Sequence, residues 1–432
     1  MKQFFFKRYF GPGDNGNGST QTLPSRLVLK LVNESQLKAN DTISLADLSL
    51  SSDEQLQFAK EFDAEDSSAL NSLAATASEK NTDYIAPDFS TIYFAILEPA
   101  KDYTDIIRQL SENTEVEFAF EDAFPAPAAV NASDDPMAIF QEYESANPLG
   151  VASFAAWDKD ITGSGIQVVD IETEWDLNHE DLPSGIPLLT GENKIDFANN
   201  DDHGTSVLGI ICGQDNDKGI VGLAPDVTMK VASIIFSPSF SVARALCRAI
   251  RKSAAGDIIL IEQQSAQFLP IETSPLIFLL IALASACDII VIEPAANATT
   301  NLDQVKVNGK TILDRNSPDF TDSGAIMVGA SVGVSPHQKN GATNFGTRVD
   351  CFASGENVTT AAKNNKYIRN FKNTSAASAI IAGVAALVQE YSANNGARLT
   401  PSEMRVLLSD NTKGLQSPDP IGVMPDLTKI II

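Results

Sequence analysis

The feature that most constrains the fold is a series of continuous apolar segments, alternating with helical patterns, that begins near residue 150. Strands that are apolar throughout are buried on both faces, as in parallel sheets covered by helices on each side. We therefore predict an α/β domain over residues 150–432. Its expected strands are Ile166–Ile171, Met229–Ile235, Asp257–Ile261, Asp288–Ile292 and Ala325–Ala330, and its expected helices include Val242–Ala254 and Ser274–Ala286.

The N-terminal third has a different pattern. Residues 1–20 are predicted to be a flexible leader, because residues 11–20 are rich in glycine and polar residues. Residues 21–124 interleave short strands and helices, which predicts a small α+β, ferredoxin-like domain, and residues 125–149 are predicted to be a linker. The expected elements are strands at Leu27–Val32, Ile92–Leu97 and Val116–Phe120, a helix at Asp102–Ser111, and partly helical structure over residues 40–82.

The charge balance excludes several classes of partner. The chain has 31 basic and 56 acidic residues, a formal charge of −25. Such a surface repels phosphate groups, so neither a nucleic acid nor an anionic membrane is expected as a partner. No apolar run reaches the ~18 residues of a spanning helix. No secretory signal pattern is present, which leaves the location open but favours the cytoplasm.

Histidine is the residue with the right ordinary pKa for a base near neutral pH, and the chain has three, at His179, His203 and His337. His203 stands where a polar loop ends and an apolar helix begins, beside a glycine that permits close approach of another segment. The alternative for His203 is a helix cap without function. His337 lies in a polar loop and is expected at the surface.

Three other polar residues suit a catalytic site. Asp170 ends an apolar strand, at the sheet edge where such folds place their sites, and Asn297 follows another strand. Ser375 begins a helix of small and apolar residues, where the backbone N–H and the helix dipole favour an oxyanion. Each of the three is also explained as a cap or a turn residue.

Taken in chain order, Asp170, His203, Asn297 and Ser375 resemble the catalytic residues of the subtilases, the subtilisin-like serine proteases. Flanking segments are similar to family segments in order and spacing over residues 150–432. They are NHEDL (178–182), HGTSVLGIICG (203–213), GIVGLAP (219–225), IIVIEPAAN (289–297), DSGAIMVGAS (322–331), FGTRVDCFASGENV (345–358) and NTSAASAIIAG (373–383).

The resemblance implies a serine endopeptidase that hydrolyses peptide bonds through an acyl-enzyme intermediate. Ser375 would be the nucleophile, His203 the general base and Asp170 the residue that orients the imidazole. Asn297 and the Ser375 N–H would hold the oxyanion. The implied partner is a peptide or protein substrate, and no cofactor is required. Structural Ca²⁺ is common in the family, but no ligand cluster stands out in the sequence.

The N-terminal third is similar to the inhibitory propeptides of the same family. Its segment TEVEFAFED, residues 114–122, resembles the last strand of such a propeptide. The order of small domain, linker and catalytic domain implies a zymogen whose own N-terminal domain inhibits it.

The chain also departs from the family pattern. Asp170-Ile171-Glu172 replaces the usual Asp-Thr/Ser-Gly, and Ala379 replaces a proline. Asn373 replaces a glycine, and since asparagine enters the left-handed region readily, we expect it to be tolerated there.

A further departure lies where the substrate would bind. IEQQSAQ, residues 261–267, stands where subtilisin has Ser-Leu-Gly for pairing with the substrate strand. Glu262, Gln263 and Gln264 are therefore the candidate substrate-binding residues.

Two other functions remain open on the sequence. The departures are compatible with a catalytically weak or inactive subtilase fold that serves as a binding or scaffold protein. TGSG, residues 162–165, suggests a nucleotide-binding loop, although the third glycine of a dinucleotide fingerprint and a Walker lysine are both missing.

Overall fold

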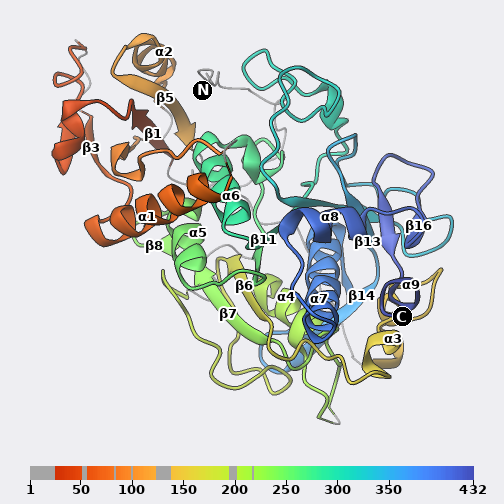
Figure 1. The fold of residues 1–432 in the computed structure, drawn as a ribbon. Coiled ribbons are helices and arrows are strands. Elements are labelled where there is room, and N and C mark those ends of the chain that lie inside the picture. The colour runs from red at the N-terminus through yellow and green to blue at the C-terminus, as the bar shows by residue number, and fades with distance from the viewer. Residues whose placement is uncertain are drawn as a thin grey trace, which may run out of the picture.

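The computed structural model describes residues 25–50, 56–81, 84–98, 101–122, 138–193, 202–216 and 218–432. The predicted leader and residues 125–137 of the predicted linker lie outside these ranges. A small N-terminal domain packs against a larger α/β domain (Figure 1).

The small domain contains an antiparallel sheet in the strand order β2-β3-β4-β1-β5. Its elements are β1 (Arg26–Leu31), β2 (Thr42–Ser44), β3 (Gln57–Lys60), α1 (Ala64–Lys80), β4 (Ile92–Ile96), α2 (Thr104–Glu112) and β5 (Val116–Asp122). The predicted α+β class is confirmed. The order of these elements is β-β-β-α-β-α-β, whereas a ferredoxin-like motif runs β-α-β-β-α-β. Two short strands, β2 and β3, follow β1 directly, and the first helix, α1, stands between β3 and β4.

The large domain is built on a sheet whose described strands run in the order β16-β17-β13-β12-β11-β10-β6-β7, all parallel except β16. The prediction of a parallel sheet is therefore confirmed. The strands are β6 (Gln167–Glu172), β7 (Thr228–Ser233), β10 (Ile258–Ile261), β11 (Ile290–Pro294), β12 (Ile326–Ser331), β13 (Cys351–Ser354), β16 (Gly414–Gln416) and β17 (Val423–Pro425). Two hairpins flank it, β8 (Ile235–Phe236) with β9 (Ser239–Phe240) and β14 (Val358–Ala362) with β15 (Lys366–Phe371).

Helices cover both faces of this sheet, as predicted (Figure 1). Alternate strand residues point to opposite faces. Val168, Ile258 and Leu260 pack with α4 (His203–Cys212) and α7 (Asn373–Asn394), whereas Val169 and Ile259 pack with α5 (Val242–Arg251) and α6 (Pro275–Ala286). The remaining helices are α3 (Phe154–Trp157), α8 (Pro401–Leu408) and α9 (Leu427–Ile430).

The small domain lies on the α5 and α6 side of the large domain, with α1 next to these two helices (Figure 1). Its apolar side chains there, Phe62, Leu70, Ala74 and Phe89, belong to the same buried cluster as residues of α5 and α6. At the rim of this interface, Arg251 of α5 pairs with Glu65 and Asp66 of α1. The interface therefore has an apolar centre and charged residues at its edge.

Three local features complete the fold. Tyr143 is buried in the core of the large domain, so the packed chain already includes residues before the expected boundary at 150. His337 is fully buried, and its Nδ1 lies 3.2 Å from the carbonyl oxygen of Val332, so the prediction of a surface histidine was wrong.

Helix α7 is long and apolar enough to cross a membrane, but 83% of its most apolar window is buried inside the protein, as in a core helix.

Candidate active site

The predicted catalytic residues meet at the carboxyl ends of the parallel strands. Asp170 and Glu172 lie at the carboxyl end of β6, and Asn297 lies in the loop after β11. His203 is the first residue of α4, and Ser375 lies in the first turn of α7. Since the carboxyl ends of parallel strands meet at one edge, elements far apart in the sequence contribute to one site.

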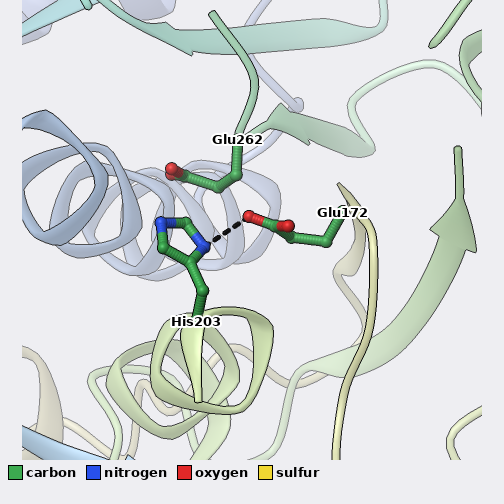
Figure 2. Close-up of side chains that lie close together, drawn as sticks. All are labelled: Glu172, His203 and Glu262. Atoms are coloured by element: carbon green, nitrogen blue, oxygen red, sulfur yellow. Dashed lines mark ion pairs between the residues drawn. The ribbon is translucent and has the colours of Figure 1, made fainter. Parts of the chain in front are cut away.

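The carboxylate that contacts His203 is that of Glu172. The His203 Nδ1 atom lies 2.5 Å from Glu172 Oε1, and both side chains are buried (Figure 2). The other oxygen of Glu172 accepts hydrogen bonds from the Thr173 N–H (2.9 Å) and from Gln263 Nε2 (3.4 Å). These contacts fix the carboxylate against the ring.

Asp170, the residue expected to orient His203, has a different partner. Its Oδ2 atom accepts a hydrogen bond of 2.7 Å from the indole N–H of Trp175. Asp170 and Glu172 are two residues apart and therefore share a face of β6, but Glu172 lies about 7 Å further toward the carboxyl edge, where α4 places the ring. The contacts thus differ from the prediction, and Glu172 occupies the position predicted for Asp170.

Three buried carboxyl groups lie close together at this edge of the sheet, since Glu262 follows β10 beside Glu172 and His203, and Asp170 precedes Glu172 on β6. Burial raises the pKa of Asp170 well above its usual range, and the nearby Glu172 raises it further. Burial likewise raises the pKa of Glu262 well above its usual range, with added contributions from Asp170 and Glu172. Like charges buried close together disfavour one another's ionisation, and of these three carboxyl groups Glu172 is the one in contact with His203.

The catalytic centre also holds several buried polar atoms that have no hydrogen-bond partner among the described residues. Among them are Ser375 Oγ, His203 Nε2, Asn297 Nδ2 and Glu262 Oε2. Buried polar groups in native proteins are nearly always paired, and exceptions are expected where a reacting group will bind. A hydroxyl, an imidazole nitrogen and an amide N–H₂ are therefore all available to contact a ligand.

The orientation of Asn297 follows from its contacts. Its Oδ1 atom accepts hydrogen bonds from the Thr374 N–H (3.2 Å) and from Thr374 Oγ1 (2.9 Å). Its backbone N–H donates to Gln264 Oε1 at 2.9 Å. Because the oxygen is taken, the amide Nδ2 is left to donate, as an oxyanion donor must.

Residues 163–422 match the sequence model of the subtilase family. The chain belongs to the subtilase family. It is 27% identical over 355 residues to the thermophilic serine proteinase of Bacillus sp. strain AK1, covering 79% of this chain and 78% of that protein. It is 25% identical over 272 residues to the intracellular serine protease of Paenibacillus polymyxa, covering 59% and 77% respectively. Together these matches identify this subtilase as a serine endopeptidase, which implies peptide or protein substrates.

A solved structure supports the fold. A protease from Pseudoalteromonas arctica aligns with a TM-score of 0.52 at 18% identity, covering 70% of this chain and 99% of that chain.

Two features of this subtilase explain residues around the site. Asn373 adopts φ +67°, so the expected left-handed conformation is confirmed. A Cβ atom added to Gly204 would lie 2.3 Å from the carbonyl oxygen of Glu174, so the residue after His203 has to be glycine. The predicted close approach of another segment at this glycine is therefore also confirmed.

The candidate substrate-binding residues are buried beside the catalytic groups. Glu262, Gln263 and Gln264 are each at most 3% exposed. Glu262 contacts Ser378 of α7, Gln263 bonds to Glu172, and Gln264 accepts from Asn297. These side chains therefore contact the catalytic machinery, and a role in binding substrate stays a prediction. That Glu172 and Glu262 lie beside His203 could have been predicted by continuing the alternation of side chains in β6 and β10 beyond the apolar residues of these strands.

One cluster of the site has the composition of a metal site. Glu172, His203 and Glu262 each offer a ligand atom within 4.8 Å of the others. Two ligands of a tetrahedral Zn²⁺, each about 2.0 Å from the metal, lie about 3.3 Å apart. The 2.5 Å between His203 Nδ1 and Glu172 Oε1 is shorter than that and is the distance of a direct ion pair, with no room for a metal between the two atoms. The cluster also falls short of the six or more oxygen ligands, roughly, that Ca²⁺ takes.

The backbone N–H groups of the loop at residues 162–165 already bond to a side chain of this protein. One carboxylate oxygen of Glu390, on α7, accepts hydrogen bonds from the N–H groups of Thr162 (2.8 Å), Gly163 (2.6 Å) and Ser164 (3.0 Å). These are the donors that a nucleotide phosphate would need. The nucleotide-binding alternative therefore fails at this loop.

Proposed function

We propose that this subtilase cleaves peptide bonds with Ser375 as the nucleophile and His203 as the general base. His203 Nε2 takes the proton from Ser375 Oγ as the oxygen attacks the carbonyl carbon. Glu172 stabilises the imidazolium that forms, which is the role that the sequence predicted for Asp170. His203 then gives the proton to the leaving amine, and water hydrolyses the acyl-enzyme. The reaction uses these side chains and water alone.

The observation that carries the proposal is the state of the His203 ring. One ring nitrogen is paired with a buried carboxylate, while Nε2 is buried and has no partner among the described residues. An imidazole held in this way is oriented and is still free to accept a proton.

A fluorophosphonate probe tests the proposal directly, because it forms a bond with an activated serine. The wild-type chain should be labelled, and Ser375→Ala should not. Ser331→Ala, which removes a buried serine hydroxyl of β12 that bonds to the carbonyl oxygen of Ala353, is the matched control and should still be labelled. Absence of labelling in the wild type would favour the binding or scaffold function instead.

We propose further that Asn297 Nδ2 and the Ser375 N–H bind the oxyanion. Asn297→Ala should lower kcat by about 10²–10³, because it removes one donor aimed at the developing charge. KM should change little, whereas the unfolding temperature should fall by roughly a few degrees, because the buried N–H and hydroxyl of Thr374 lose their acceptor. Steady-state kinetics with a peptide substrate and a thermal melt measure these effects, and an unchanged kcat would show that another group supplies the donor.

The N-terminal domain is proposed to inhibit the catalytic domain. The apolar interface with α5 and α6 and the pairs of Arg251 with Glu65 and Asp66 support a specific docked state. The predicted entry of the domain's last segment into the cleft falls partly outside the described residues, which resume at residue 138.

If the domain inhibits, adding it as a separate polypeptide to the processed enzyme should slow peptide hydrolysis. Arg251→Glu should weaken that inhibition, because it places like charge opposite Glu65 and Asp66. Mass measurement of the processed chain should locate a cut within residues 125–150. An intact chain that is fully active and insensitive to added domain would contradict the zymogen proposal.

A further inference from the structure

Glu262 lies at the junction of the two elements that carry the catalytic chemistry. It is the first residue after β10, and it continues the alternation of Ile258 and Leu260, so its side chain points to the α7 face. Its Oε1 atom contacts the hydroxyl of Ser378, one helical turn after Ser375. Figure 2 shows its carboxyl group next to the His203 ring, on the side away from Glu172.

The hydrogen bonds of Ser378 limit where the protons can be. Ser378 Oγ lies 2.7 Å from the carbonyl oxygen of Thr374 and 3.2 Å from that of Ser375, in addition to its contact with Glu262. A serine hydroxyl has one hydrogen to donate. A serine inside a helix commonly donates it to the carbonyl four residues earlier, here Thr374. The contact with Glu262 then needs a hydrogen from the carboxyl group.

The charges around Glu262 favour the same arrangement. Asp170 and Glu172 face it from β6, His203 faces it from α4, and the serine hydroxyls face it from α7. Of these described groups, His203 is the one that can carry a positive charge, and Glu172 already pairs with it. A second carboxylate would therefore be buried without a counter-ion, which is costly.

We infer that Glu262 is a positioning residue that stays a neutral carboxylic acid and donates a hydrogen bond to Ser378. This bond ties α7, one turn after Ser375, to the end of β10. It does so without placing another negative charge beside His203, where such a charge would oppose the oxyanion. The inference rests on the proposed function for its effect on catalysis, but the proton on Glu262 can be measured independently.

Two variants of the full chain test the positioning role. Glu262→Ala should lower kcat by about 10²-fold with KM little changed, because the nucleophile helix loses its anchor while the substrate contacts remain. Glu262→Gln should restore most of that loss, because its amide N–H₂ can donate to Ser378 as the acid does.

The acid limb of kcat/KM against pH separates a neutral Glu262 from an ionised one. If Glu262 is neutral, the limb of Glu262→Gln should coincide with that of the wild type. If Glu262 is ionised, removing its charge lowers the pKa of the imidazole, and the limb should move to lower pH by more than about half a unit. That shift would overturn the inference.

Infrared difference spectroscopy gives a readout that does not depend on activity. The wild-type protein at neutral pH should show the carbonyl stretch of a buried protonated carboxyl group that Glu262→Gln removes. Asp170→Asn is the control, since it should remove a different band. If the spectrum of Glu262→Gln still contains every carboxyl band of the wild type, the inference is refuted, even if the probe labels Ser375. If Glu262→Gln loses the band but the probe does not label the wild type, the proposed function is refuted, while the inference that Glu262 is protonated stands.

Discussion

Replacing Ser375 by alanine should lower kcat by about 10⁶-fold, the loss seen when the nucleophile or the base of a subtilisin triad is removed. His203→Ala should have an effect of the same size, because Ser375 Oγ has no other base with a free ring nitrogen beside it in the described site. The double variant should be hardly worse than either single one, since the two residues act as a unit.

Kinetics with a peptide substrate, after removal of the N-terminal domain, measure this loss. Circular dichroism should show that both variants fold, because neither residue makes a hydrogen bond to another described side chain through Oγ or Nε2. Turnover by Ser375→Ala at the wild-type rate would exclude Ser375 as the nucleophile.

Replacing Glu172 by glutamine should lower kcat by about 10⁴-fold, because an amide beside Nδ1 no longer holds the ring in the required tautomer or stabilises the imidazolium. We expect this large loss for Glu172 because its carboxylate is the one that contacts His203, at 2.5 Å. The matched variant Asp170→Asn should cost far less, since Asp170 bonds to the indole N–H of Trp175 and burial raises its pKa well above its usual range, which disfavours a charge there.

The comparison of kcat between these two variants decides which carboxylate serves His203. The opposite ranking, with a loss of about 10⁴ for Asp170→Asn and little loss for Glu172→Gln, would restore the assignment predicted from the sequence. Equal, large losses would show that the two carboxyl groups titrate as one coupled pair.

Much of the fold could be predicted from local patterns. The apolar runs of β6, β10 and β11 occur where they were expected, because a strand buried on both faces needs apolar residues at every position. The first helix of the small domain was less predictable. Its segment is polar and rich in serine and alanine, and two short strands precede the helix. His337 was misjudged because a polar loop by itself does not show what covers it.

By itself, the sequence determined the family, the parallel sheet and the place of His203, Asn297 and Ser375 at the ends of particular elements. These features depend on short-range periodicity and on motifs that are contiguous in the chain. Only the tertiary structure decided which carboxyl group meets His203. Asp170 and Glu172 share a face of β6, and the choice between them depends on where α4 lies along that strand. The contact of Glu262 with Ser378 joins residues 116 positions apart, and no local pattern specifies how close two such distant side chains lie.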